Sequence, residues 1–409
     1  MMHREPSTTR VAPTRTSAKG WCPGAYRPMV SGDGWLVRVR PRLARLSALQ
    51  ATGLCQVARR FGSGVIDLTS RANLQLRGVQ ARDHGAVIDA LCGLGLLDAD
   101  PALEAWPAIL VAPMWQAGDD TECIVTELMA RRAGLPALPP KFGFAVDAGP
   151  APVLGDASAD VRIERGRSGA LIVRADGAEA GHPVSRSGAA DAALAMATWF
   201  ARTAASHEPA ARRMAAHLAH LALPAALAPR EAPALPAPLP APGRSSIGPV
   251  YGAAFGQIDA SALTRLLHDT HAAALRLAPN RVLILEGGDW CDATDFITTA
   301  DDPLRRVDAC PGAPSCSSAT VDTRALARAL ARSLALATTT TTPRSVHVSG
   351  CTKGCARARA AEITLVGRDG AFDLVRHGRA WDAPTHTALS PDVSPGDLLS
   401  LLGAPDAQL

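Results

Sequence analysis

The sequence lacks a long apolar run, a glycine-rich dinucleotide fingerprint and any large excess of charge. No apolar stretch approaches the roughly 20 residues that a membrane span needs. The polar, arginine-containing start, Met1–Lys19, does not resemble a secretory signal, so we expect a disordered tail and a cytoplasmic protein. A formal net charge of +4 is too small to indicate nucleic-acid binding. No Gly-x-Gly-x-x-Gly motif follows a predicted strand, so we expect no built-in nicotinamide or flavin domain, and electrons would have to come from another protein.

Lysine is almost absent, although arginine is abundant. The only lysines are Lys19, Lys141 and Lys353, and the many alanines and arginines suggest a coding bias that turns most lysines into arginines. Lysines that survive such a bias are either needed as compact point charges or remain by chance. Lys141, in Leu-Pro-Pro-Lys-Phe, and Lys353, between two cysteines, are therefore candidate functional residues, with chance survival as the alternative.

Four of the nine cysteines form two pairs near the C-terminus. Cys310 and Cys316 lie in Cys-Pro-Gly-Ala-Pro-Ser-Cys, and Cys351 and Cys355 lie in Cys-Thr-Lys-Gly-Cys after a gap of 34 residues. Four thiolates on two tight turns can hold one iron–sulfur cluster. A zinc site is one alternative, although its paired cysteines usually lie about two to four residues apart. Disulfides are another, but nothing else in the sequence indicates an oxidising compartment. The remaining cysteines are scattered: Cys22, Cys55, Cys92, Cys123 and Cys291.

A proline-rich linker divides the sequence into two similar halves. Residues 223–246 repeat Pro and Ala so densely that neither a helix nor a central strand can form. Each half begins with a strand–helix–strand pattern. In the first half the pattern is Trp35–Arg40, Leu43–Phe61 and Val65–Thr69; in the second it is Val250–Gly256, a helix capped by Asp259 that runs to Ala278, and Arg281–Glu286. The repetition predicts an internal duplication, with a ligand between two pseudo-symmetric partners.

Beyond the second unit, a helix is predicted over Thr323–Thr338. The strands Ser345–Ser349 and Glu362–Gly367 are predicted on either side of the second cysteine pair.

A row of polar side chains is predicted in the segment from Thr69 to Val79. If this segment is extended, Arg71, Asn73, Gln75 and Arg77 project to one face, and the alternate apolar residues project to the other. A row of guanidinium and amide groups suits a large flat ligand edged with carboxylates. A sheet face exposed to water is the other interpretation.

Two histidine pairs have a spacing that could ligate a metal ion. His217 and His220, like His268 and His271, lie one helical turn apart. Neither pair has an acidic partner at motif distance, so ordinary surface or core histidines are the preferred interpretation.

The cysteine motifs resemble the iron–sulfur motif of the sulfite and nitrite reductases. Ser349-Gly-Cys351-x-x-x-Cys355, followed after six residues by Glu362-Ile-Thr-Leu365, is similar to that motif, and the pair Cys310 and Cys316 fits it. The segment Leu68-Thr-Ser-Arg71-x-Asn73-x-Gln75 resembles the family's tetrapyrrole-binding strand. Leu138-Pro-Pro-Lys141-Phe resembles the segment whose lysine reaches the substrate face.

The resemblance covers the chain from about Cys22 to the C-terminus. It implies an α+β fold with a pseudo-two-fold duplicated architecture, in which ferredoxin-like half-domains accompany iron–sulfur and tetrapyrrole-binding α/β domains. The domains expected from it are a tail (1–20), the first half-domain (21–85), the first α/β domain (86–222), the linker (223–246), the second half-domain (247–300) and a 4Fe-4S-binding domain (301–409).

Two departures from the reductases argue against reduction of a small anion. Gly143 stands where those enzymes usually place a second lysine, and the segment Pro107–Val111 lacks their Arg-Asn pair. Fewer cations would weaken the binding of sulfite or nitrite. The departures favour a tetrapyrrole bound as the substrate, in the place where the reductases hold sirohaem.

Other short motifs resemble a branch of the family that oxidises a tetrapyrrole with dioxygen. They are Cys22-Pro-Gly, Lys141-Phe-Gly-Phe-Ala-Val-Asp147, Ala253-Ala-Phe-Gly-Gln257, Cys310-Pro-Gly-Ala-Pro and Gly378-Arg-Ala-Trp-Asp382. The resemblance implies a monooxygenase that hydroxylates precorrin-3A and closes an acetate side chain to a γ-lactone. Its substrate-binding residues would be the polar row and Lys141.

The same resemblance implies a 4Fe-4S cluster on the four paired cysteines, with Cys355 freed from bridging to sirohaem. It also implies a separate non-haem iron, whose ligands the sequence does not disclose and for which His347 is a candidate, and an external donor that is either a reductase using NAD(P)H or a ferredoxin-like protein. Sirohaem is expected only under the alternative of a sulfite or nitrite reductase. A zinc-stapled binding module that uses the same cysteines is the third hypothesis.

Overall fold

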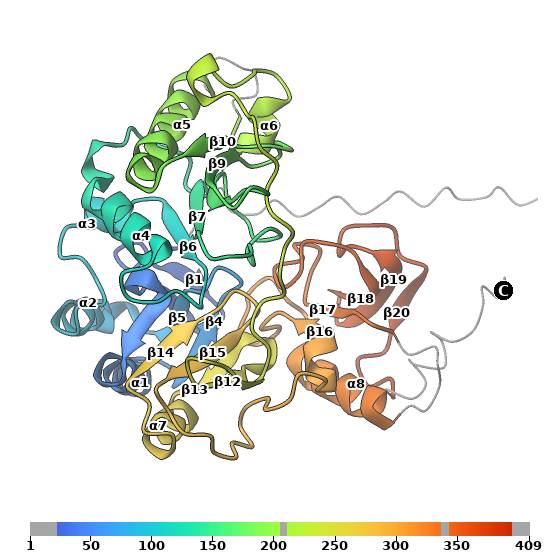
Figure 1. The fold of residues 1–409 in the computed structure, drawn as a ribbon. Coiled ribbons are helices and arrows are strands. Elements are labelled where there is room, and N and C mark those ends of the chain that lie inside the picture. The colour runs from blue at the N-terminus through green and yellow to red at the C-terminus, as the bar shows by residue number, and fades with distance from the viewer. Residues whose placement is uncertain (1–22, 205–210, 337–342, 395–409) are drawn as a thin grey trace, which may run out of the picture. The chain divides into compact units, whose positions relative to one another are not determined.

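The computed structural model describes residues 23–204, 211–336 and 343–394 (Figure 1). The predicted tail, Cys22 and the last two residues of the helix predicted over Thr323–Thr338 lie outside these ranges. The chain divides into two compact units. The larger unit contains Trp35–Thr298 and the short segment that ends at Met29, and the smaller contains Val30–Gly34 and the chain from Thr299 onward.

Two similar half-domains form the centre of the larger unit. The first contains β2 (Gly34–Val39), β3 (Arg45–Ser47), α1 (Ala48–Phe61), β4 (Val65–Leu68) and β5 (Leu74–Val79). The second contains β11 (Gly243–Arg244), β12 (Pro249–Gly252), β13 (Gln257–Asp259), α7 (Ala260–Asp269), β14 (Ala274–Leu277) and β15 (Val282–Glu286). The half-domains exchange a three-residue strand each, because β3 pairs with β14 and β13 pairs with β4, both antiparallel. This reciprocal exchange confirms the predicted duplication.

The two helices of the half-domains are shorter than predicted. Helix α1 begins at Ala48, not at Leu43, because Ser47 and Gln50 form a capping box, and the residues before it form the exchanged strand β3. Helix α7 begins as predicted at the cap of Asp259, but it ends at Asp269, and Leu275 lies in β14. Leu46 before α1 and Leu275 after α7 are buried in the same core, and they reach it from the short strands β3 and β14. The predicted strand Val250–Gly256 likewise ends at Gly252, where a 3₁₀ turn follows.

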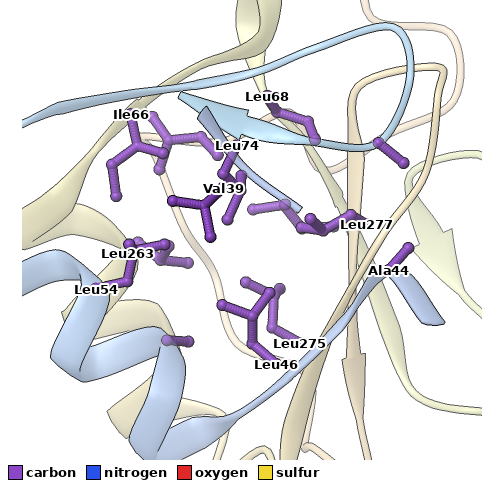
Figure 2. Packing of buried hydrophobic residues seen from close by; sticks show 14 of the residues in the cluster. Val39, Ala44, Leu46, Leu54, Ile66, Leu68, Leu74, Leu263, Leu275 and Leu277 are labelled. Atoms are coloured by element: carbon purple, nitrogen blue, oxygen red, sulfur yellow. The ribbon is translucent and has the colours of Figure 1, made fainter. Parts of the chain in front are cut away.

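The apolar faces of both half-domains pack into one core. Figure 2 shows Val39, Ile66 and Leu74 from the first sheet above Leu54 of α1 and Leu263 of α7. In Figure 1, α1 and α7 lie side by side on one side of the strands, and the two helices are in contact. Burial of such side chains stabilises the fold by about 1.5–3 kcal/mol each. The opposite face of the first sheet is thereby left for polar side chains.

The larger unit also contains a five-stranded mixed sheet and further helices, of which α2 packs into the core of the half-domains. The sheet order is β10-β9-β8-β7-β6, with β6, β7 and β8 parallel and the remaining pairs antiparallel. Its strands are β6 (Ala108–Val111), β7 (Gly143–Asp147), β8 (Val161–Arg165), β9 (Leu171–Ala175) and β10 (His182–Val184). The helices are α2 (His84–Gly93), α3 (Pro101–Glu104), α4 (Asp120–Ala130), α5 (Ala189–Thr203) and α6 (Met214–Leu218).

The smaller unit contains a sheet of the same topology. Its order is β16-β17-β18-β19-β20, with β16, β17 and β18 parallel and the remaining pairs antiparallel. The strands are β16 (Val307–Ala309), β17 (Val346–Ser349), β18 (Ala361–Arg368), β19 (Ala371–Gly378) and β20 (His386–Leu389), with α8 (Arg324–Leu336) after β16. The short strand β1 (Met29–Ser31) lies mainly in this unit.

The proline-rich linker has the extended character that its composition predicts. It contains a single 3₁₀ turn at Ala225–Leu227, and its one strand, β11, lies at a sheet edge. Isolated bridges join Glu231 to Gly181 and Pro233 to Gly166. Throughout the described ranges, no helix is long and apolar enough to cross a membrane.

Candidate functional site

The predicted row of polar side chains is only partly a strand. Strand β5 begins at Leu74, and Ala72 before it has a left-handed φ of 52°. The chain therefore turns between β4 and β5, and Arg71 and Asn73 precede the strand instead of extending it. The expectation of four side chains in one extended row is wrong, because that turn breaks the alternation on which it depends.

Gln75 and Arg77, the two residues of the row that lie in β5, form contacts with the neighbouring strands. Gln75 Oε1 accepts a hydrogen bond of 2.9 Å from Arg38 Nη2, across the pair of strands β2 and β5. Arg77 Nη1 donates to Asp67 Oδ2 at 3.0 Å, and the Arg77 side chain is only 3% exposed. Because a buried ion pair requires both partners, the Arg77 side chain is engaged within the fold. The apolar alternation of Leu74 and Leu76 is confirmed, since both are fully buried.

Arg71 and Asn73, the two residues of the row that precede β5, make contacts outside the sheet. Asn73 is buried and lines a cavity of about 220 Å³, whose wall also includes Arg40, Glu104 and Trp106. Burial raises the pKa of Glu104 to about 7. Arg71 reaches instead to the neighbouring layer, where its Nη2 donates to Ser158 Oγ at 2.9 Å.

A buried carboxylate, Asp160, joins three chain segments next to the Ser158 hydroxyl that Arg71 contacts. Asp160 is fully buried just before β8, and it accepts hydrogen bonds from the backbone N of Gly143 (3.1 Å), from Arg213 Nε (2.9 Å) and from the backbone N of Met214 (2.9 Å). Arg213 also donates to Ser158 Oγ and to the carbonyl of Ala159. This group could not be predicted from the sequence, because Asp160, Ser158 and Arg213 belong to no recognisable motif.

Two candidate positions lie at the start of β7. Lys141 is half-buried two residues before the strand, and among the described residues its Nζ has no hydrogen-bond or ion-pair partner. Gly143 is buried, and a Cβ added there would lie 3.1 Å from the carbonyl oxygen of Ala108. A lysine at 143 would therefore require its neighbours to shift, which gives a physical reason for glycine at that position.

The four paired cysteines follow parallel strands of the smaller unit. Cys310 comes directly after β16, and Cys351 comes two residues after β17. The carboxyl ends of parallel strands meet at one edge of a sheet, so the two loops come together. The backbone N of Gly350 donates to Cys310 Sγ at 3.1 Å, and Lys353 Nζ donates to Ser318 Oγ at 2.7 Å.

The paired thiols affect one another's ionisation. Burial first, and then the nearby thiols of Cys310, Cys351 and Cys316, raise the pKa of Cys355 to about 11. Burial first, and then the thiols of Cys310 and Cys316, also raise the pKa of Cys351. Yet no three His, Cys, Asp or Glu side chains in the described ranges converge closely enough to hold a single metal ion. A polynuclear cluster, whose ligands bind separate iron atoms, suits four neighbouring but separated thiols.

Tight turns shape both cysteine loops. Gly312 and Gly354 have left-handed φ angles of 69° and 62°. A Cβ at Gly354 would lie 3.0 Å from the Trp381 ring. The carbonyl of Cys310 accepts a hydrogen bond from Thr323 Oγ1, which ties the first loop to the start of α8. The donor set and its turns therefore fit a four-thiolate cofactor.

The histidines do not form metal sites in the described part of the chain. His217 is fully buried and its Nε2 lies 2.7 Å from Thr203 Oγ1, and exposed His268 pairs with the adjacent Asp269. The preference for ordinary core and surface histidines is consistent with these contacts. His347 is fully buried in β17, between Asp308 of β16 and Thr364 of β18 in the strand register.

Comparison with known proteins gives three findings. The family profile of the nitrite/sulfite reductase ferredoxin-like half domain matches residues 27–93. A curated protein named precorrin-3B synthase, from Sinorhizobium sp, is 31% identical over 432 residues, which cover 97% of this chain and 91% of that protein. The solved structure of the Mycobacterium tuberculosis NirA protein matches with a TM-score of 0.69 at 17% identity, over 92% of this chain and 82% of that one. The last match shows the fold alone, and it confirms the predicted α+β architecture with duplicated half-domains.

Proposed function

The chain belongs to the precorrin-3B synthase family, and from that premise we propose that it converts precorrin-3A to precorrin-3B. The reaction proposed is an oxygen-dependent hydroxylation of the macrocycle with closure of an acetate side chain to a γ-lactone. The observation that carries the proposal is the 31% identity to a precorrin-3B synthase along nearly the whole chain.

The larger unit is proposed to bind the substrate. Precorrin-3A is a tetrapyrrole with many carboxylates, and guanidinium and ammonium groups bind carboxylates strongly. Arg71 and Lys141 are the proposed contacts, with Asn73 and Gln75 as further polar neighbours. Arg77 is proposed to act indirectly, because its ion pair with Asp67 holds the strand that carries Gln75. Fixing a substrate by its periphery orients the reacting carbon, which is a large part of catalysis.

Cys310, Cys316, Cys351 and Cys355 are proposed to hold a 4Fe-4S cluster in the smaller unit. Such a cluster, when bound, supplies electrons one at a time, as the activation of dioxygen requires. The chain's own part is to present four thiols, which would bind the metal as thiolates, and to fix them on the turns at Gly312 and Gly354. Thiolates of this kind need a reducing compartment, so we place the enzyme in the cytoplasm.

A separate non-haem iron does not fit the residues described. No group of three potential ligands converges in those ranges, and His347 is enclosed between two strands. The electrons are proposed to come from a separate protein, either a reductase that uses NAD(P)H or a ferredoxin-like donor, because the sequence has no nucleotide-binding fingerprint.

Anaerobic purification with analysis of iron, acid-labile sulfide and the visible spectrum tests the proposal. We expect iron and sulfide in similar amounts, an absorption spectrum without haem, and oxygen uptake when precorrin-3A and a reductant are added. A sirohaem spectrum with turnover of sulfite or nitrite would instead show a reductase. Zinc without acid-labile sulfide would show the binding module.

Arg71→Ala tests the substrate face separately from the cluster. We expect weaker binding of precorrin-3A by about tenfold or more, since a hydrogen-bonded charge contributes about 1.5–3 kcal/mol. Iron and sulfide should stay at the wild-type level. Arg202→Ala, at an exposed position of α5, is the matched control. Unchanged affinity in the Arg71 variant would remove this residue from the site.

A further inference from the structure

Two arginines from different layers of the larger unit meet at one hydroxyl. Arg71 Nη2 lies 2.9 Å from Ser158 Oγ, and Arg213 Nη1 and Nη2 lie 3.2 Å and 3.1 Å from the same oxygen. Arg71 comes from the turn between β4 and β5, whereas Arg213 directly precedes α6. A hydroxyl oxygen has two lone pairs, so three N–H groups compete for it. A carboxylate, with two oxygens and about four acceptor sites, would satisfy these donors better.

Hydrogen bonds to Asp160 and Ala159 fix the orientation of the Arg213 guanidinium. Asp160 is fully buried and accepts Arg213 Nε at 2.9 Å, while the carbonyl of Ala159 accepts Arg213 Nη2 at 2.8 Å. These contacts orient the guanidinium, so that little side-chain freedom would be lost when a ligand binds. On the other side, Ser158 is exposed and the Arg213 side chain is 33% exposed. A ligand can therefore approach the pair from solvent.

The pair lies at the same edge of the sheet as Lys141. Gly143 begins β7, Val161 begins β8, and Asp160 joins the two strands through the Gly143 backbone N. Lys141 precedes Gly143 by two residues. Because a Cβ at Gly143 would crowd the Ala108 carbonyl, a cation cannot come from position 143 without a shift. Arg213 supplies a cation beside this position from a distant part of the chain.

We propose that Arg213 and Arg71 together bind one carboxylate of the tetrapyrrole substrate, in the place where Ser158 Oγ now meets both guanidiniums. This inference rests on the proposed function, because it names which substrate group is held and adds a residue to the site. Arg213 is a binding and specificity residue: it selects a macrocycle whose rim carries a carboxylate at this position.

Binding of uroporphyrin III, a tetrapyrrole with eight carboxylates, tests the inference without turnover. Quenching of tryptophan fluorescence gives Kd for the full chain with its cluster, and iron and sulfide content are measured on each variant. We expect Arg213→Gln to raise Kd by about tenfold to hundredfold, the range for a charged hydrogen bond. Arg213→Lys keeps the positive charge beside Asp160 but loses the paired N–H donors of the guanidinium, so we expect a smaller rise in Kd than for Arg213→Gln. Arg202→Gln, at an exposed position of α5, should stay within about twofold of wild type.

Two further binding measurements test whether the bound group is a carboxylate and whether both arginines bind the same one. A porphyrin with cationic N-methylpyridyl groups in place of carboxylates should not bind less tightly to Arg213→Gln than to wild type. The double variant Arg71→Gln/Arg213→Gln should lose less than the sum of the single losses, because both groups share one carboxylate. If folded Arg213→Gln and Arg213→Lys bind uroporphyrin III like wild type while Arg71→Gln does not, the shared subsite is wrong and the proposed function stands. If wild type itself does not bind uroporphyrin III, both the tetrapyrrole site and this inference fail.

Discussion

Glu286 joins the two half-domains, and its removal should destabilise the larger unit in a pH-dependent way. Arg45 of β3 and Arg276 of β14 lie directly opposite each other in the exchanged strand pair. Two like charges so placed repel. Glu286 of β15 neutralises them, because it accepts Arg45 Nε at 2.8 Å and Arg276 Nε at 2.8 Å. Arg276 in turn lies over the Trp115 ring and donates to the carbonyl of Trp115.

The magnitude follows from the titration of this carboxyl. The hydrogen bond from Arg45, and then those from Arg276 and the charges of both arginines, lower the pKa of Glu286 from 4.5 to about 2. At about 1.36 kcal/mol for each pKa unit, the ionised form stabilises the fold by up to about 3 kcal/mol. Since the folded pKa lies below the unfolded one, this stability is complete above about pH 5 and is lost as the pH falls toward 2. At pH 3.5 it should be smaller by about 1 kcal/mol.

Glu286→Gln imitates the protonated form, and urea unfolding measures its cost. Tryptophan fluorescence reports mainly on the larger unit, which contains Trp35, Trp106, Trp115, Trp199 and Trp290. We expect the free energy of unfolding to fall by about 2–3 kcal/mol at pH 7, and by about 1 kcal/mol less at pH 3.5. Asp295→Asn is the matched control, because its ion pair with Arg265 is exposed and should contribute at most about 0.5 kcal/mol. A loss below 0.5 kcal/mol at pH 7, or one that does not change with pH, would refute the reasoning.

Two further predictions concern the cluster and the backbone. Cys316→Ser should lower iron and acid-labile sulfide to near zero after anaerobic purification, whereas Cys123→Ser on α4 should leave both unchanged; retained sulfide in the Cys316 variant would exclude a four-cysteine cluster. Gly256→Ala should lower the free energy of unfolding by about 1–3 kcal/mol, because Gly256 has a φ of 76° and its Cβ would lie 2.2 Å from the carbonyl oxygen of Leu68. Gly85→Ala in α2, where a Cβ meets nothing within 4 Å, should instead stabilise by about 0.5–1 kcal/mol, and equal effects of the two changes in urea unfolding would contradict this account.

The elements that carry their own local signal were predictable. Asp259 fixes the first turn of α7 by a bond to the backbone N of Ala262, and this cap was recognised in the sequence, whereas the equivalent cap of α1 at Ser47 was missed. The cysteine spacing likewise predicts a cluster on the loops after β16 and β17, and this stays a prediction. The predicted helices were too long because three-residue strands such as β3 have no periodicity to detect, and their leucines match a helical pattern by coincidence.

The contacts at the candidate binding face were not predictable, because they join residues far apart in the sequence. Arg71 and Ser158 are separated by 87 positions, and Arg213 and Ser158 by 55. The turn at Ala72 was also hidden, since a left-handed alanine gives no compositional sign. Arg77 was assigned to the ligand face by alternation alone, and alternation cannot distinguish a side chain open to a ligand from one paired with Asp67.

The two α/β sheets share one topology but carry different groups: the cysteines follow β16 and β17, whereas Lys141 and Ser158 precede β7 and β8. In the smaller unit, the loops after β16 and β17 carry the thiols. In the larger unit, the loop after β7 is fixed by Asp147, the last residue of the strand, whose carboxylate accepts the backbone N–H groups of Val153 and Leu154. Arg162 of β8 then donates to the carbonyls of Leu154 and Ala157. Because these bonds fix the chain up to the residue before Ser158, the meeting point of the two arginines is set by the fold before any ligand arrives, as a preorganised carboxylate site requires.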